Sequence, residues 1–143
     1  MSASGEHIML PTQADTAERT GRVERIQLMV KQLYHHDLTH TKADIPFLQR
    51  LFDDRVFKND ETFKWQTAGL AFGEVLAHEL GLHWVMYEDQ YGRDPALRYQ
   101  ETSIVVFPLT MLSKRIEDKK RADLQSIFDQ TAKLIPDLAK KSY

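Results

Sequence analysis

The chain has 143 residues, no cysteine and a formal net charge of −2 at pH 7. A chain of this length favours one domain that folds without metals or disulfides. The lack of cysteine excludes disulfides, thiolate zinc sites and cysteine nucleophiles. The small net charge argues against a nucleic-acid-binding protein, which normally carries a strong basic excess. We find no signal-peptide pattern and no apolar run of membrane length, so we expect a cytoplasmic protein that does not enter a membrane.

The first residues differ in character from the rest of the chain. Residues 1–14 are mostly polar and predict a flexible N-terminal tail. Residues 15–143 are then predicted to form a single globular domain. Within the tail, residues 8–10 are apolar and could still dock on that domain.

Three helices are predicted in the first half of the chain. The first begins at Asp15 followed three residues later by Glu18, which resembles a capping box, and ends near residue 36. The second starts near Asp44, with Pro46 tolerated in its first turn, and ends near residue 56.

The third predicted helix, residues 60–81, is the centre of the predicted fold. Its apolar residues cover nearly the whole circumference, which is typical of a core helix with neighbours on two sides. Gly69 and Gly73 are unfavourable inside a helix, so each predicts the close approach of another backbone. Asn59 or Asp60 is a candidate cap, and Gly81 suits a left-handed stop.

After Gly81 the apolar residues alternate, which predicts strands. The first strand covers residues 83–89, and Gly92-Arg93 is predicted to form a two-residue hairpin turn. This register places Tyr87 opposite Arg98 on a half-solvated face. The apolar run 102–107 predicts a third strand that is buried on both faces.

The remainder of the chain is predicted to be helical. Pro108 opens a helix, residues 117–121 interrupt it with charged side chains, and a last helix follows that Pro136 bends or restarts. The predicted fold class is α+β, with three N-terminal helices, a three-stranded antiparallel β-meander and C-terminal helices.

Two groups of histidines contain the right residue type for a metal site, but neither is expected to bind a metal. His78 and His83 are five residues apart, whereas zinc proteases need a spacing of four to bring both imidazoles onto one helix face. His35, His36 and His40 lie at a predicted helix end, where they complement the helix dipole. We therefore expect neither a metal nor a cofactor.

Glu74 is the candidate for chemistry on the central helix. It lies on the narrow polar side, and His78 follows four residues later, the spacing of a carboxylate–imidazole contact. A catalytic base and a structural tie to a backbone or an arginine are both compatible with this pattern. We assign no catalytic residue and include Glu74 among the candidate binding residues.

The predicted hairpin tip is the densest polar and aromatic cluster in the sequence. Loops on rigid hairpins often carry binding residues, although cross-strand ion pairs also explain this composition. The further candidate binding residues are Tyr87, Asp89, Tyr91, Arg93 and Arg98. Because arginine stacks on tyrosine and is common at binding anchors, we expect loss of Arg98 to weaken binding more than folding.

A basic run near the C-terminus contains Lys114-Arg115 and Lys119-Lys120-Arg121. From Leu109 onward, eight Lys and Arg residues stand against five Asp and Glu residues, a net charge of +3 that leaves −5 on the rest of the chain. Without interleaved aromatic residues, a solvated helix face is the simplest explanation, and an acidic protein partner is the alternative.

Several short motifs lie between Gly69 and Asp118. They are Gly73-Glu74-Val75, Gly81, Trp84-Val85, Asp89, Tyr91-Gly92-Arg93-Asp94, Phe107-Pro108-Leu109 and Lys114-Arg115. Together they resemble the signature of an uncharacterised bacterial domain-of-unknown-function family. The resemblance implies a small soluble bacterial domain and no particular activity.

The sequence combines a full set of fold signals with no assembled catalytic set. This favours a non-enzymatic protein-interaction module, regulatory or immunity-like by analogy, that binds an unidentified protein partner. We expect a monomer or a weak homodimer. The alternative is a small-ligand-binding protein or hydrolase that uses Glu74, His78 and the hairpin charges.

Overall fold

A computed structural model describes residues 7–141, without the side chains of Leu134 and of residues 136–141. In chain order its elements are β1 (Ile8–Met9), α1 (Gln13–Tyr34), the short 3-10 helix η2 (Lys42–Asp44), α2 (Ile45–Asp53), α3 (Thr62–Leu80), β2 (Leu82–Asp89), β3 (Gly92–Tyr99), β4 (Val105–Val106), α4 (Pro108–Glu117) and α5 (Leu124–Lys141).

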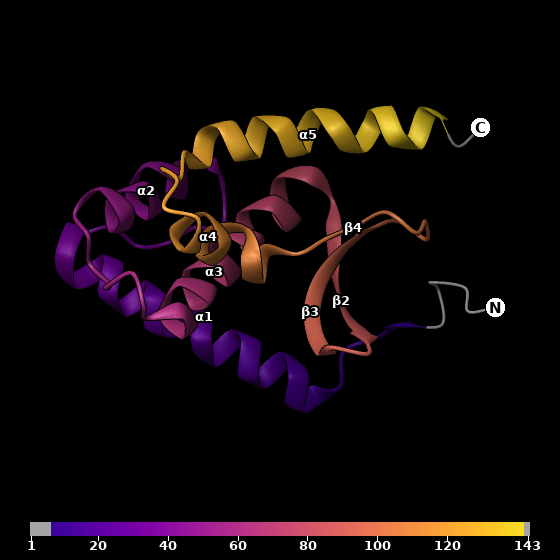
Figure 1. Ribbon diagram of the computed structural model, residues 1–143, viewed down its shortest axis with the longest axis horizontal. Helices are drawn as coiled ribbons and strands as arrows, with labels where there is room; N and C mark the ends of the chain where they lie inside the picture. The colour runs from indigo at the N-terminus through magenta and orange to yellow at the C-terminus, as the bar shows by residue number, and fades with distance from the viewer. Residues whose placement is uncertain (1–6, 142–143) are drawn as a thin grey trace.

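The sheet lies at one end of the molecule, and α5 extends along the upper side as far as that end (Figure 1). In Figure 1 the sheet lies at the right, α1 runs along the lower side, α5 runs along the upper side, and α3 and α4 lie between them. The strands form one antiparallel sheet in the order β1-β2-β3-β4. The predicted α+β class is therefore confirmed, whereas the sheet has one strand more than the predicted meander.

The extra strand comes from the segment that was predicted to be a tail. Ile8 pairs with Tyr87 and Met9 pairs with Met86, so part of this segment belongs to the sheet. At the opposite edge, the predicted strand 102–107 is reduced to the two residues of β4. Its residues are half-buried, so the predicted burial on both faces is wrong.

The hairpin turn also differs from the prediction. Gln90 and Tyr91 form the turn, and Asp89 pairs with Gly92, so the predicted turn at Gly92-Arg93 is wrong. The Asp89 side chain explains the difference, because its Oδ1 accepts a hydrogen bond from the Tyr91 N–H at 2.8 Å. Such an aspartate closes a turn without a glycine at the first central position.

Two helix starts are corrected as well. The capping box of α1 joins Thr12 and Asp15, not Asp15 and Glu18: Thr12 Oγ1 accepts the Asp15 N–H at 3.1 Å, and the Asp15 carboxylate accepts the Thr12 N–H at 2.8 Å. The N-cap of α3 is Glu61, whose side chain makes no capping hydrogen bond. The predicted cap residues, Asn59 and Asp60, are therefore not the N-cap of α3.

The predicted close approach of another backbone is confirmed at Gly69, where the partner is the start of α4, whereas the neighbours of Gly73 are side chains. A Cβ atom at Gly69 would lie 2.3 Å from the carbonyl oxygen of Pro108. A Cβ atom at Gly73 would lie 2.7 Å from the Trp84 ring and 2.8 Å from the Pro108 side chain. Gly81 ends α3 in the left-handed conformation, with φ 66°, as predicted.

Gly69→Ala should therefore destabilise the protein, because the new methyl group meets backbone atoms of Pro108 that cannot move without shifting α4. We expect the free energy of unfolding to fall by about 2–3 kcal/mol, as for other overpacked sites, in urea denaturation. Gly21→Ala in α1 is the matched control: nothing lies within 4 Å of its added Cβ, and stability should rise by up to about 1 kcal/mol. Equal effects at the two positions would contradict the predicted clash.

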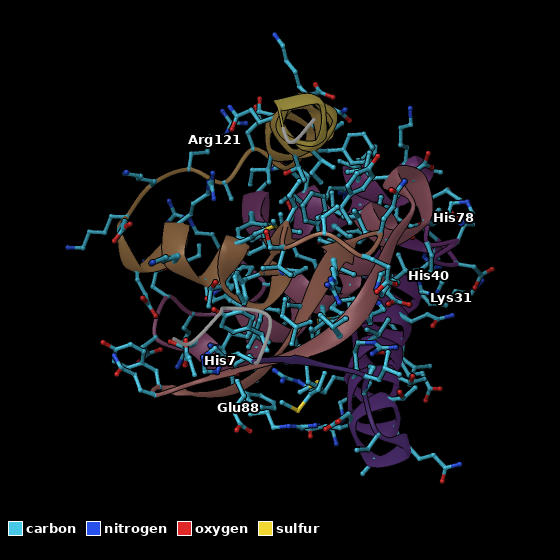
Figure 2. The ribbon with its side chains drawn as sticks, turned by 90° about the vertical axis from the view of Figure 1, so that its right-hand side faces the viewer. His7, Lys31, His40, His78, Glu88 and Arg121 are labelled. Carbon is cyan, nitrogen blue, oxygen red and sulfur yellow. The ribbon has the colours of Figure 1, made fainter. Side chains whose placement is uncertain are left out.

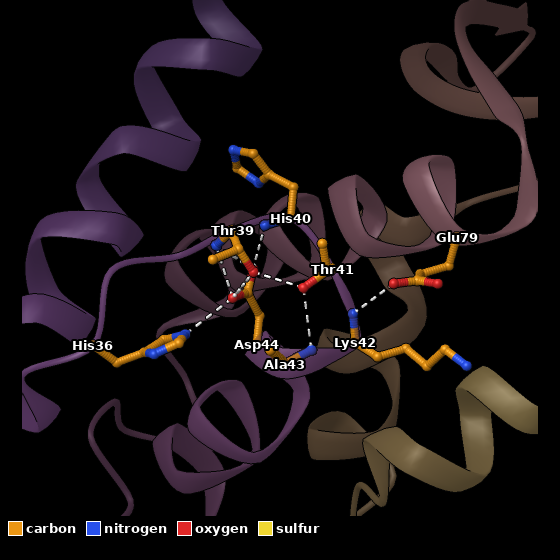
Figure 3. Close-up of polar contacts among 8 residues, drawn as sticks. All are labelled: His36, Thr39, His40, Thr41, Lys42, Ala43, Asp44 and Glu79. Carbon is orange, nitrogen blue, oxygen red and sulfur yellow. Dashed lines mark hydrogen bonds and ion pairs between the residues drawn. The ribbon is translucent and has the colours of Figure 1, made fainter.

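The connection between α1 and α2 is organised around the buried carboxylate of Asp44, which is 1% exposed (Figure 3). The carboxylate accepts the N–H of Thr39 at 2.8 Å and of His40 at 2.7 Å, and it lies 3.0 Å from Nε2 of His36. The second helix starts at Asp44, as predicted, but the side chain serves the preceding loop instead of capping the helix.

Asp44→Asn should destabilise this loop, because an amide offers one acceptor oxygen and turns an N–H group toward backbone donors. We expect a loss of about 2–4 kcal/mol, the range for a buried, multiply bonded carboxylate. Asp37→Asn is the control: its side chain is 76% exposed and contacts Lys31 at 3.1 Å. Its loss should change the free energy of unfolding by less than about 1 kcal/mol in the same assay.

Candidate functional site

A cavity of about 400 Å³ opens between the loop that follows α2 and the loop that joins α4 to α5. Clefts of this volume commonly bind ligands or partner segments. Its floor is aromatic and its rim is basic; we call it the basic cavity. The residues that define it are Phe52, Phe57 and Trp65 on the floor and Arg55, Lys119, Lys120 and Arg121 on the rim.

The floor is preorganised because its three rings pack on one another. The Trp65 ring stacks on Phe52 with 4.4 Å between centroids and meets the edge of Phe57 at 4.9 Å. Trp65 Nε1 donates a hydrogen bond to the Lys58 carbonyl at 2.9 Å, so its polar group is satisfied. Trp65 is 2% exposed and Phe57 5% exposed, which leaves Phe52 as the most accessible ring.

Two rim cations occupy backbone positions that favour glycine. Arg55 and Lys119 have φ values of 51° and 57°, and each follows the end of a helix, α2 or α4. At both ends a hydrogen bond spans five residues, from the Val56 N–H to Leu51 and from the Lys120 N–H to the carbonyl of residue 115. This is the Schellman motif, whose left-handed residue is usually glycine because side chains cost about 1 kcal/mol there.

The rim carries a clear excess of positive charge. Arg55, Lys119, Lys120 and Arg121 are all exposed, and none of them has an ion-pair partner within residues 7–135 whose side chains are described. Asp53 is the one carboxylate in the described lining. The interpretation of Lys119 to Arg121 as a helix face is wrong, since α4 ends at Glu117 and these residues lie in a loop.

The hairpin residues predicted to bind lie elsewhere, on the sheet. Tyr91 at the turn is 87% exposed, and Asp89 holds that turn. The Tyr87 ring packs edge-on against Phe107 at 5.2 Å. Tyr87 pairs with Asp94 in the sheet.

Arg98 does not face Tyr87, so that predicted pairing is wrong: its partner across the hairpin is His83. Its Nε donates to the Thr102 carbonyl at 2.6 Å and its Nη2 to the Glu101 carbonyl at 3.2 Å. Arg98 therefore holds the turn between β3 and β4. This contact explains the residue without a binding partner.

Glu74 is engaged by two neighbours inside the fold. Trp84 Nε1 donates a hydrogen bond to Glu74 Oε1, and Arg19 Nε lies 3.8 Å from the same oxygen. The Arg19 guanidinium also lies over the Trp84 ring, 4.6 Å from its centroid. His78 is exposed and makes no hydrogen bond to Glu74 within the described side chains. Of the two alternatives for Glu74, a catalytic base and a structural tie, the geometry matches the structural tie.

Arg93 ties the hairpin to the start of α1. Its Nη1 and Nη2 donate to the two carboxylate oxygens of Asp15 at 2.5 Å and 2.6 Å. These hydrogen bonds, together with that from the Thr12 N–H, hold the pKa of Asp15 well below its usual range. The same pair raises the pKa of Arg93. A bidentate ion pair of this kind orients both elements.

A smaller cavity of about 150 Å³ lies beside this ion pair. Its charged lining comprises three arginines and three carboxylates, Arg19, Arg22, Arg93, Asp15, Glu18 and Asp94. These charges balance, and two of the arginines are engaged by Asp15 and by Thr67. The basic cavity therefore has the stronger attraction for a charged ligand.

The Asp15 pKa predicts a pH-dependent contribution to stability. Because the folded pKa lies below the ordinary value of 3.8, this contribution is present above about pH 4 and is lost as the pH falls further. Arg93→Ala should therefore lower the urea midpoint more at about pH 6 than at about pH 2.5. A pH-independent difference would contradict this assignment. In the Asp15→Asn background, Arg93→Ala should lose the pH-dependent part of its effect.

Sequence reasoning missed the residues that bring the basic cavity together. Phe52, Phe57 and Trp65 follow the pattern of core residues in the predicted helices, and they do pack in the core. The available signal was a basic residue at each of two helix stops, at Arg55 and Lys119, where glycine is common. This signal becomes informative only when the ends of the two helices are known to lie next to each other.

Two further observations bear on the chemistry of the described residues. No three His, Asp or Glu side chains in this part of the chain come together as a metal site. None of the helices between residues 7 and 141 has both the length and the apolar composition needed to cross a membrane.

Comparisons with known proteins add a family and a fold. A family model described as a domain of unknown function (DUF3806) matches residues 44–128. A crystal structure from Bacteroides thetaiotaomicron VPI-5482 has a similar fold, with a TM-score of 0.78 and 18% sequence identity. The match covers 91% of this chain and 50% of that one, so the chain spans about half the length of the matched protein. No curated protein matches.

Proposed function

Since the chain belongs to the family of domains of unknown function DUF3806, whose description carries no activity, we propose a function from the geometry alone. The protein is a non-enzymatic protein-interaction module that binds an acidic segment of a partner protein in the basic cavity. The observation that carries this proposal is the excess of cations without ion-pair partners, among the described side chains, around an aromatic floor.

The charge and the apolar floor indicate the chemistry of the bound segment. Carboxylates would pair with the four rim cations, and an aromatic or aliphatic side chain would contact Phe52. The cations come from two loops and are exposed, an arrangement that suits a chain lying across the opening. A nucleotide base is a less suitable ligand, because bases bind by stacking on aromatic rings. The rings of Trp65 and Phe57 already pack on one another and on Phe52 within the floor.

The lining gives no support to catalysis in this cavity. Among the described residues it contains one carboxylate, Asp53, and no histidine, serine, threonine or tyrosine. Lysine can also act as a base or nucleophile, but Lys119 and Lys120 are exposed on the rim, and both kinds of chemistry need a second positioned group. A module that acts by binding alone would regulate or neutralise its partner by occupying it, which is the regulatory or immunity-like role.

The left-handed rim residues allow a test that separates binding from folding. In the double variant Arg55→Gly/Lys119→Gly, two cations are lost while glycine relieves two strained positions. We expect the melting temperature to stay the same or rise by a few degrees. Affinity for an acidic pentapeptide with a central tyrosine should fall at least about fivefold at low salt, measured by isothermal titration calorimetry.

Gln100→Gly is the matched control, because Gln100 also has a positive φ, 50°, but lies in the turn after β3, outside the lining of the cavity. It should bind the peptide as the wild type does. Unchanged peptide affinity in the double variant, or equal loss in the control, would rule out the basic cavity as the binding site.

A further inference from the structure

The hairpin tip of this protein has the chemistry that the basic cavity is proposed to bind. Tyr91 projects from the two-residue turn and is 87% exposed, which is high for so large a side chain. Glu88, Asp89 and Asp94 flank it and are exposed as well. The tip is therefore an acidic segment with a central aromatic side chain.

Arg93 is the cation of the tip segment 88–94 itself, and it does not cancel the charge of the three carboxylates. Both terminal nitrogens of Arg93 are bound by Asp15, and its Nε lies 3.9 Å from Glu88 Oε1. On the neighbouring helix, Arg19 and Arg22 balance Asp15 and Glu18, and these arginines are engaged by Glu74 and Thr67. Three carboxylates against one guanidinium leave the tip segment 88–94 with a net charge of −2.

The turn is also preorganised for insertion. The hydrogen bond from the Tyr91 N–H to Asp89 Oδ1 fixes the backbone at 2.8 Å. The strands β2 and β3 that carry the turn are paired without interruption, from Asp89 with Gly92 to Leu82 with Tyr99. A tyrosine on a rigid turn loses little conformational freedom on binding, which favours it as an anchor.

The tip cannot occupy the basic cavity of its own chain. In Figure 1 the turn between β2 and β3 lies at the lower right, whereas the end of α2 and the loop between α4 and α5 lie at the left. In the perpendicular view of Figure 2, Glu88 and Arg121 are again widely separated. Any contact between tip and cavity must therefore join two molecules.

We propose that the basic cavity also binds the hairpin tip of a second copy of this chain, with Tyr91 against Phe52 and the flanking carboxylates against the rim cations. This inference rests on the proposed function, because it uses the same cavity and the same chemistry. Tip and cavity are different surfaces, so the contact is head-to-tail and continues into short chains or a ring.

The small size of the tip sets the strength of this association. A single turn buries much less surface than the roughly 1,200–2,000 Å² of a stable protein interface, so the contact is weak and forms at high protein concentration. Self-association then competes with the acidic segment of a partner for the same cavity. Because the rim is exposed, added salt weakens both.

Sedimentation velocity of the full chain tests the proposal. The weight-average mass of the wild type should rise above the monomer value between about 10 and about 500 µM and return toward it in about 0.5 M NaCl. Tyr91→Ala and the double variant Arg55→Gly/Lys119→Gly should each remain monomeric. The control Gln100→Gly should associate as the wild type does.

Mixing the two monomeric variants gives the decisive measurement. One retains an intact cavity and the other an intact tip, so an equimolar mixture should form dimers and no larger species. A wild type that stays monomeric at about 500 µM, variants that associate like the wild type, or a mixture that stays monomeric would each overturn the inference.

The acidic pentapeptide distinguishes this failure from failure of the proposed function. Tyr91→Ala keeps the cavity and should bind the peptide with wild-type affinity. If the peptide binds while the wild type stays monomeric, self-association is wrong and the cavity remains a binding site. If the peptide does not bind, the proposed function fails together with the inference.

Discussion

The backbone of Pro108 lies directly against α3 because Gly69 has no side chain at the point of contact, and Gly73 leaves room for the Pro108 and Trp84 side chains. This approach places α4 on the central helix and brings Leu112 into the core, where it is fully buried. The chain then leaves α4 beside the end of α2, so the two loops that bound the basic cavity are neighbours. Without the two glycines the helices would stand apart, and the cations of these loops would not share one opening.

The two helix ends at the cavity combine a favourable and an unfavourable feature. Basic side chains near a helix C-terminus interact favourably with the helix dipole. A left-handed conformation, in contrast, disfavours any residue with a Cβ, and Arg55 and Lys119 both adopt it. Gln100 shares this conformation outside the cavity, so Arg55 and Lys119 are distinguished by combining a left-handed backbone with an exposed cation on the rim.

The predicted binding residues on the sheet and on α3 are mostly engaged in internal contacts. Arg93 joins the hairpin to α1, Arg98 holds the turn that follows β3, and Glu74 is bound by Trp84. Polar side chains that tie elements together produce the same composition as a recognition surface. Tyr91 differs from them, since its side chain is exposed at the turn.

Local patterns were sufficient for most elements of the fold. The α+β class, the central helix with its left-handed stop at Gly81, the close backbone approach at Gly69 and the helix that follows Pro108 were predictable, because periodicity, glycine and proline act within a few residues of themselves. The hairpin register was not predictable, since one side-chain hydrogen bond of Asp89 decides it.

The strand β1 and the basic cavity were decided only by the tertiary structure. Ile8 and Met9 gain their partner β2 from a distant part of the chain, and two residues carry too little pattern to predict a strand. The cavity joins the ends of α2 and α4, and neither loop alone indicates the other. Electrostatic attraction depends on distance in space, so charges that appear as separate solvated positions along the chain share one cavity rim when packing brings them together.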